Sequence, residues 1–117
     1  MKDEFKYGKA VSYTYNFLTN NFGHKTYYDE FFSQIDLPLK DNDLVLDVGC
    51  GSGLLAFSLL REYKIKRGIN IIVHGFDISR DILQIAYRKS LKIDFQDNIK
   101  LFLGNAQDIS KLEDFTT

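Results

Sequence analysis

The chain has 117 residues, of which 44% are hydrophobic, and its fifteen Lys and Arg nearly balance sixteen Asp and Glu, giving a net charge of −1. This length supports one core and excludes a second independent domain, and the balanced charge disfavours surfaces that bind nucleic acid or anionic membranes. No apolar run approaches the roughly 20 residues needed to cross a bilayer. The single cysteine, Cys50, cannot form an internal disulfide, and the opening residues show no secretory leader pattern, so we expect a cytoplasmic protein.

The first forty residues predict two short helices, because apolar side chains recur there twice at helical spacing. The first helix is expected over about residues 8–20. The second is expected to end near Leu37-Pro38, since a proline biases the residue before it away from helix. The first apolar stripe is Val11, Tyr15, Leu18 and Phe22, and the second is Tyr28, Phe31, Phe32 and Ile35.

Strands and helices then alternate. Apolar runs at residues 44–48, 71–76 and 99–103 predict strands, and residues 53–63 and 79–91 between them have helical periodicity. Ser79 is a candidate N-cap of the second of these helices. Such alternation is typical of an α/β fold with parallel strands joined by right-handed crossovers. We therefore expect a Rossmann-like open parallel sheet of three strands in the order 3-2-1, with helices on both faces. The charged residues after the first helix, Lys64, Lys66 and Arg67, are expected to form a solvated helix end.

The candidate chemistry lies at the carboxyl ends of the strands, where open α/β sheets bind ligands. Glycines at 49, 51 and 53 allow a tight turn and a close approach of the backbone to a ligand. Asp77 follows the second strand, where a carboxylate can accept hydrogen bonds from the hydroxyls of a ribose. Together these residues predict a crevice that binds a nucleoside.

The glycine turn has two other readings. A turn of this kind can be simple turn geometry. A dinucleotide site requires G-x-G-x-x-G, but the third glycine would fall at Leu54, and the observed pattern is G-x-G-x-G. A nicotinamide-dependent oxidoreductase is therefore disfavoured.

Three segments resemble the motifs of the class I S-adenosylmethionine-dependent methyltransferases: LVLDVGCGSG at 44–53, HGFDIS at 74–79 and LGNAQD at 103–108. The resemblance covers about residues 40–110. It implies that the glycine loop contacts the methionine part of S-adenosylmethionine, that Asp47 helps to fix the loop and the amino group, and that Asp77 binds the ribose. Ile78 would pack on the adenine, whose edge Asn105 and Ala106 would bind; many members have Asp where Asn105 stands. The implied cofactor-binding residues are Asp47, Gly49, Cys50, Gly51, Ser52, Gly53, Asp77, Ile78, Asn105 and Ala106.

No catalytic residue is nominated, because methyl transfer requires mainly alignment of the acceptor. His24 and His74 lack metal-ligand spacing, so no metal site is expected. Tyr27 and Tyr28 belong to an aromatic stripe that is more typical of a core than of a site. Cys50 is interpreted as a small residue tolerated in the loop and not as a nucleophile.

The resemblance covers the first half of the family's fold. We therefore expect residues 1–117 to form one truncated domain, with a helical cap at 1–40 and an S-adenosylmethionine-binding βαβαβ unit at 41–117. The edge of the first strand would be unpaired, which predicts self-association, a partner chain covering that edge, or a shortened form of a longer enzyme. The expected function is the cofactor-binding portion of a methyltransferase, and the alternative is a non-catalytic S-adenosylmethionine-binding module that needs a partner.

Overall fold

The computed structural model describes residues 24–93 and 95–116. The helix expected over residues 8–20 lies outside this part of the chain. No described helix has both the length and the apolar character needed to span a membrane. The described elements are α2 (His24–Gln34), β1 (Leu44–Val48), α3 (Leu54–Leu60), the π-helical turn η2 (Arg61–Lys66), β2 (Ile72–Asp77), α4 (Arg80–Lys92), β3 (Ile99–Leu103), the 3-10 turn η3 (Ile109–Lys111) and β4 (Glu113–Asp114).

The sheet has the order β1-β2-β3-β4, which confirms the α/β class and the relative order of the three expected strands. β1 pairs in parallel with β2, with Leu46 opposite His74, and β2 pairs in parallel with β3, with Phe76 opposite Phe102. A fourth strand was not expected. It is the short β4, which pairs antiparallel with β3 and places Asp114 opposite Phe102.

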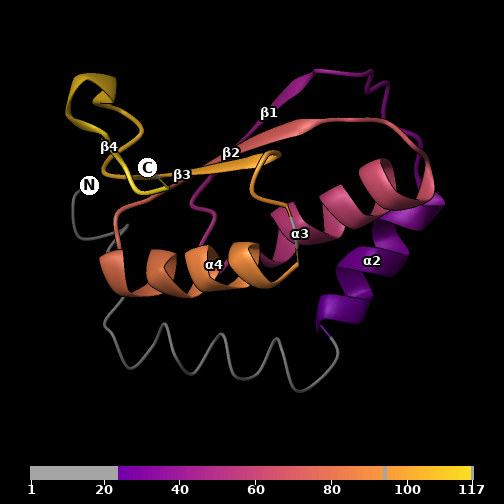
Figure 1. The fold of residues 1–117 in the computed structure, drawn as a ribbon, viewed down its shortest axis with the longest axis horizontal. Coiled ribbons are helices and arrows are strands. Elements are labelled where there is room, and N and C mark those ends of the chain that lie inside the picture. Colours follow the sequence, from indigo (N-terminus) through magenta and orange to yellow (C-terminus); the bar gives the residue numbers. More distant parts are fainter. Residues whose placement is uncertain (1–23, 94, 117) are drawn as a thin grey trace.

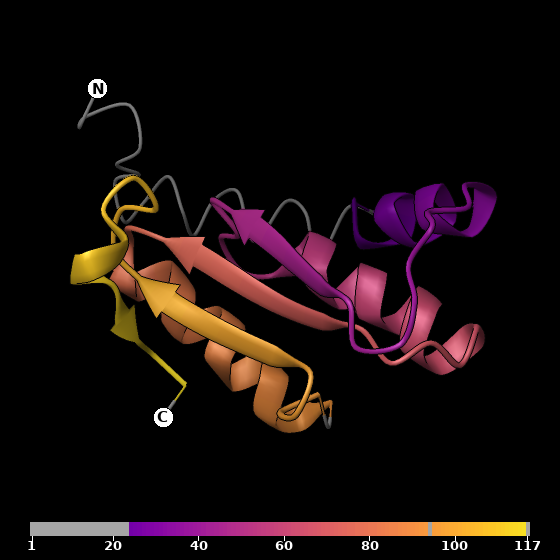
Figure 2. The same cartoon turned by 90° about the horizontal axis from the view of Figure 1, so that it is seen from above.

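Helices α3 and α4 lie on the same side of the sheet, and α2 packs against α3 (Figures 1 and 2). The expectation of helices on both faces was therefore wrong for the described residues. The physical reason is that both crossovers are right-handed and the strand order advances in one direction, so both connecting helices fall on one side. Along β2, buried and half-buried residues alternate, and on β1 the side chains of Leu44, Leu46 and Val48 are 54%, 58% and 67% exposed.

The core fills the space between the covered face and the helices. Leu60, Tyr63, Ile71, Leu83 and Leu101 each have 0% exposure and belong to one contiguous cluster. α3 is buried almost all round, as its apolar sequence predicted, and it continues into η2, where the Arg67 N–H donates to the Glu62 carbonyl. Burial of this cluster anchors the two helices that face the sheet.

Arg67 ties α2 to the rest of the fold and does not form a solvated helix end as expected. Its Nη2 donates to the carbonyl oxygens of Phe32 at 3.0 Å and Ile35 at 2.7 Å, near the end of α2. Its Nε pairs with the buried Glu62 carboxylate at 3.0 Å, and its guanidinium lies 4.4 Å from the Tyr63 ring centroid. The planar guanidinium spreads its donors over three nitrogens and so reaches acceptors on different sides, a geometry that the single ammonium of a lysine would not reproduce.

Candidate functional site

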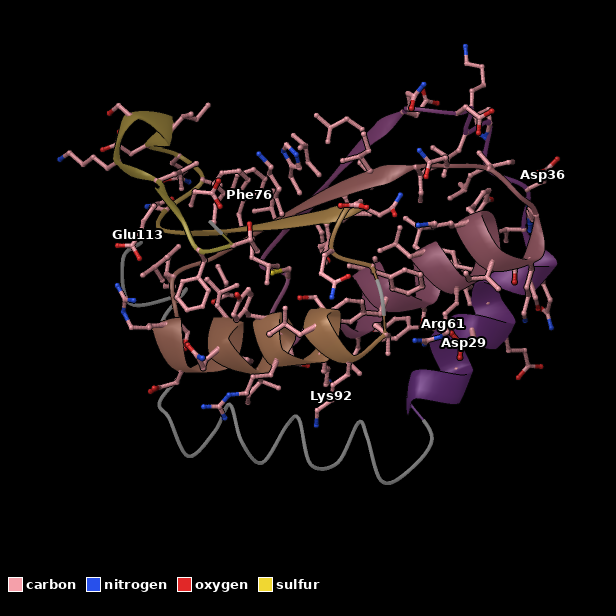
Figure 3. All side chains as sticks on the ribbon, viewed as in Figure 1. Asp29, Asp36, Arg61, Phe76, Lys92 and Glu113 are labelled. Carbon is pink, nitrogen blue, oxygen red and sulfur yellow. The ribbon has the colours of Figure 1, made fainter. Side chains whose placement is uncertain are left out.

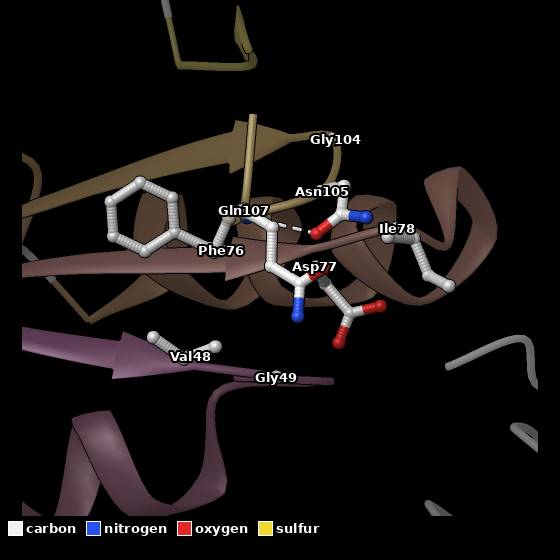
Figure 4. A pocket seen from close by; sticks show the side chains of 9 residues that line it. Val48, Gly49, Phe76, Asp77, Ile78, Gly104, Asn105 and Gln107 are labelled. Atoms are coloured by element: carbon white, nitrogen blue, oxygen red, sulfur yellow. Dashed lines mark hydrogen bonds between the residues drawn. The ribbon is translucent and has the colours of Figure 1, made fainter. Parts of the chain in front are cut away.

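The carboxyl ends of β1, β2 and β3 converge on one crevice, which has about 510 Å³ of empty space open to solvent (Figure 4). Each of the three segments that the sequence marked contributes to it. The lining residues are Val48, Gly49, Phe76, Asp77, Ile78, Gly104, Asn105, Ala106 and Gln107.

The glycine loop between β1 and α3 adopts left-handed backbone at three positions, with φ values of +73° at Gly49, +57° at Gly51 and +85° at Gly53. The N–H groups of Gly49 and Cys50 both donate to the Phe76 carbonyl, at 2.7 and 3.0 Å, so the loop is fastened to β2. A Cβ added at Gly49 would meet no atom within 4 Å, whereas one at Gly53 would lie 2.6 Å from Cε2 of Phe57. Gly49 therefore leaves open space at the crevice, and Gly53 permits packing of α3.

Asp77 holds the glycine loop against the end of β2. Its Oδ2 accepts a hydrogen bond from the Gly51 N–H at 3.0 Å and its Oδ1 accepts one from the Ser79 N–H at 2.9 Å. Its side chain is nearly buried, with 4% exposure. Since an ionised carboxylate offers about four lone-pair positions, Asp77 retains acceptor capacity for a ligand.

Asp47 lies close to Asp77 and has an unused acceptor. Its Oδ2 is buried and has no hydrogen-bond partner within the described part of the chain. Burial raises the pKa of Asp47 from 3.8 to about 6, and the nearby charge of Asp77 adds to this rise. Such an acceptor is costly to leave unpaired, and a cationic or hydrogen-donating group of a ligand would satisfy it.

The third wall of the crevice follows β3. Gly104 has a φ of +143°, and its N–H donates to the Asp77 carbonyl at 2.9 Å. The Asn105 side-chain oxygen accepts a hydrogen bond from the Gln107 N–H at 2.9 Å, which closes a tight turn. This turn brings the Gln107 side chain over the crevice (Figure 4).

Four lining residues were not among the expected cofactor-binding residues: Val48, Phe76, Gly104 and Gln107. The first two could have been found from strand periodicity, because each is the outward residue nearest the end of its strand. Gly104 and Gln107 lie in the LGNAQD segment, which assigned them no contact, and Gln107 is placed by the turn at Asn105.

Some expected site residues do not line the crevice. Cys50 and Ser52 belong to the loop but are buried, with 8% and 4% exposure. Burial raises the pKa of the Cys50 thiol, with Asp47 adding to the effect, so this cysteine is a poor nucleophile. Asp47, Gly51 and Gly53 are also outside the lining: the Gly51 N–H donates to Asp77, and Gly53 packs against Phe57. In the described part of the chain, no group of three or more His, Cys, Asp and Glu could hold a metal ion.

Comparison with known families identifies the fold and motifs. A model described as a methyltransferase domain matches residues 39–116, and the chain belongs to the S-adenosylmethionine-dependent methyltransferase family, as the motifs indicated. The ubiquinone/menaquinone biosynthesis C-methyltransferase UbiE of Rickettsia prowazekii is 36% identical over 86 residues, covering 74% of this chain and 33% of that protein. A probable cobalt-precorrin-6B C(15)-methyltransferase of Methanococcus maripaludis is 33% identical over 81 residues, covering 68% of this chain and 39% of that protein. The chain thus spans about a third of the length of these curated relatives.

Solved structures agree with this assignment. An S-adenosylmethionine-dependent methyltransferase from Thiobacillus denitrificans, in complex with S-adenosylhomocysteine, has a TM-score of 0.50 and 27% identity, covering 60% of this chain and 26% of that one. A putative S-adenosylmethionine-dependent methyltransferase from Methanococcus maripaludis shares the fold, with a TM-score of 0.63 at 14% identity over 86% of this chain and 43% of that one. S-adenosylmethionine is the cofactor of the family to which this chain belongs.

Proposed function

We propose that this chain binds S-adenosylmethionine in the crevice at the carboxyl ends of β1, β2 and β3, and forms the cofactor-binding portion of a methyltransferase. The observation that carries the proposal is the buried Asp47 oxygen without a partner among the described residues, beside a glycine loop that leaves open space. An ammonium group at the loop would supply the donor that Asp47 lacks. The remaining lone pairs of Asp77 would accept the ribose hydroxyls.

The contacts expected for the adenine of the cofactor also fit this crevice. Ile78 is half-buried and lines the crevice, where its side chain would pack on the adenine ring. Asn105 and Ala106 line the opposite wall and would meet the adenine edge. We propose that the loop residues contribute to cofactor binding through their backbone and packing. These residues are Cys50, Gly51, Ser52 and Gly53.

The charge of the crevice favours this cofactor over a dinucleotide. The lining includes Asp77 and adjoins Asp47, and no lining residue is Lys, Arg or His. Two carboxylates would attract a sulfonium and an ammonium group, and they would repel a pyrophosphate. The site therefore disfavours a nicotinamide dinucleotide on electrostatic grounds, in agreement with the glycine spacing.

When bound, S-adenosylmethionine would supply an electrophilic methyl group on its sulfonium. The residues of this chain would hold that group in place and orient it, which is the main requirement of an in-line displacement.

Calorimetric titration with S-adenosylhomocysteine and S-adenosylmethionine tests the proposal. We expect micromolar binding that Asp77→Ala abolishes. Ile78→Ala should weaken it at least about tenfold, because it removes three side-chain carbon atoms from the adenine contact. Ile109→Ala is the matched control, since Ile109 is 78% exposed on η3 and should leave affinity unchanged. A folded wild-type chain that binds neither compound at millimolar concentration would refute the proposal.

The second candidate function is a non-catalytic S-adenosylmethionine-binding module that acts through a partner. It is favoured by β1, which within the described sheet has a neighbour on one side only and carries the exposed side chains of Leu44, Leu46 and Val48. We accordingly propose that a second copy or another polypeptide covers this edge. We also propose that the chain divides into a helical cap at 1–40 and a binding unit at 41–117. Methyl transfer by the purified chain alone would exclude this candidate, and sedimentation would test the association. A cytoplasmic location stays a prediction.

A further inference from the structure

The side-chain amide of Asn105 has a defined orientation at the β3 wall of the crevice. One end of this amide lies 2.9 Å from the Gln107 backbone nitrogen, and because an N–H group can only donate, the atom that faces it must be the oxygen. The Nδ2 group then occupies the other end of the amide and points to the side of Ile78 (Figure 4). Asn105 therefore presents a hydrogen-bond donor at this wall, and its oxygen is engaged in the turn.

This donor is available to a ligand. Asn105 is exposed, and within the described part of the chain its Nδ2 group donates no hydrogen bond. The lining holds no Lys, Arg or His, so its side-chain N–H donors are the amides of Asn105 and Gln107. A base that packs on Ile78, as the proposed function requires, would meet the Nδ2 group of Asn105 at its edge.

The turn that carries Asn105 is held on both sides. Before it, the Gly104 N–H donates to the Asp77 carbonyl at 2.9 Å, which ties the turn to the end of β2. After it, Glu113 of β4 pairs with Arg80 in the first turn of α4 at 3.2 Å (Figure 3). The amide is therefore oriented before a ligand binds, which reduces the entropic cost of using it.

A donor at this position determines which purine edge the crevice accepts. The 6-amino group of adenine is itself a donor and cannot pair with Nδ2, whereas a ring nitrogen of adenine can accept from it. The 6-oxo group of hypoxanthine can also accept from it. A carboxylate in place of the amide would instead accept from a 6-amino group and repel a 6-oxo group. Resting on the proposed function, we propose that Asn105 donates to the purine edge, and that the crevice binds a 6-oxopurine nucleoside as well as an adenine nucleoside.

Titrations with S-adenosylhomocysteine and S-inosylhomocysteine test the inference, because these two compounds differ only at the purine edge. We expect the wild-type chain to bind both, with dissociation constants within about tenfold of each other. Asn105→Asp should raise the preference for S-adenosylhomocysteine at least about fivefold, because the carboxylate pairs with the amino group and repels the 6-oxo group. An aspartate can accept the Gln107 N–H as asparagine does, so the turn is retained.

Asn42→Asp is the matched control. It makes the same chemical change in the exposed turn before β1, at the other end of the strands from the crevice, and φ at this position is +70°, which aspartate also tolerates. Its preference should equal that of wild type. A second readout is NMR of the Asn105 Nδ2 protons, which are identified by their absence from Asn105→Asp and should shift when either compound binds.

A rise in preference of the expected size in Asn105→Asp, with no rise in Asn42→Asp, supports the inference. A smaller rise, or Nδ2 proton signals that neither compound shifts, overturns it. A wild-type chain that binds S-adenosylhomocysteine and fails to bind S-inosylhomocysteine also overturns it and leaves the proposed function intact. A folded chain that binds neither compound refutes the proposed function and the inference together.

Discussion

Replacing Asp47 by Asn tests whether this carboxyl is held in the fold at an energetic cost. Burial and the charge of Asp77 raise the pKa of Asp47 from 3.8 to about 6. Between these values the folded state binds more protons than the unfolded state, so stability falls as pH rises. The contribution of Asp47 to the free energy of unfolding is fully present below pH 3.8 and is lost as the pH rises through about 6.

The magnitude follows from the size of the shift. A difference of about two pKa units at roughly 1.4 kcal/mol each corresponds to about 3 kcal/mol. The amide of Asn carries no charge and nearly the same shape. Asp47→Asn should therefore be close to wild type in stability at pH 4 and more stable by up to about 3 kcal/mol at pH 7.5.

Urea denaturation of both proteins from pH 4 to pH 8 measures this difference, since the titration of all other groups cancels to first order. Asp97→Asn is the control, because Asp97 is exposed, and its profile should stay parallel to that of wild type. Parallel profiles for wild type and Asp47→Asn would refute the reasoning. A second readout is S-adenosylmethionine affinity, which in wild type should rise as pH increases from 5 to 7 and in Asp47→Asn should be lower and nearly independent of pH.

Three further changes have defined outcomes. Gly53→Ala should destabilise the fold by at least about 1–2 kcal/mol in urea titrations, because φ is +85° and the new Cβ would lie 2.6 Å from the Phe57 ring; an unchanged midpoint would contradict this. Tyr63→Phe should cost about 1–2 kcal/mol by the same measurement, because the Leu37 N–H donates to the Tyr63 hydroxyl at 2.8 Å and would lose its acceptor; a loss below about 0.5 kcal/mol would argue for replacement by water. Leu46→Lys should leave stability within about 0.5 kcal/mol, since the side chain is 58% exposed, but should reduce any self-association in sedimentation; an undiminished dimer would move the contact elsewhere.

The strands were the most predictable part of the fold. The bounds of β1 and β3 agree with the apolar runs at 44–48 and 99–103, and β2 is displaced by one residue. The displacement arises at Ile71, which is fully buried but whose N–H donates to the Ile69 carbonyl instead of a neighbouring strand. Ser79 was correctly predicted as the N-cap of α4, where its hydroxyl accepts from the Ile82 N–H.

Long-range contacts were less predictable, because local pattern does not encode them. The sequence placed Arg67 in a charged helix end, yet its partners Phe32 and Ile35 lie more than thirty residues away. The open face of the sheet was also missed, although the strand order and crossover hand imply it. In the site, glycine spacing predicted the loop and Asp77, but only the structure shows that Asp77 fastens the loop and that Asp47 keeps an unused oxygen.

The site and the open edge of the sheet depend on different parts of the fold. The crevice is centred on β2, whose neighbours β1 and β3 flank it on both sides, and its loop is fastened to the Phe76 carbonyl and the Asp77 carboxylate. Burial on the helix-covered face holds these strands in register, whereas the outer edge of β1 has no neighbouring strand in the described sheet. Covering that edge should therefore change the free energy of unfolding more than it changes the geometry of the crevice. Cofactor binding and assembly with a partner can consequently be measured as separate equilibria in this chain.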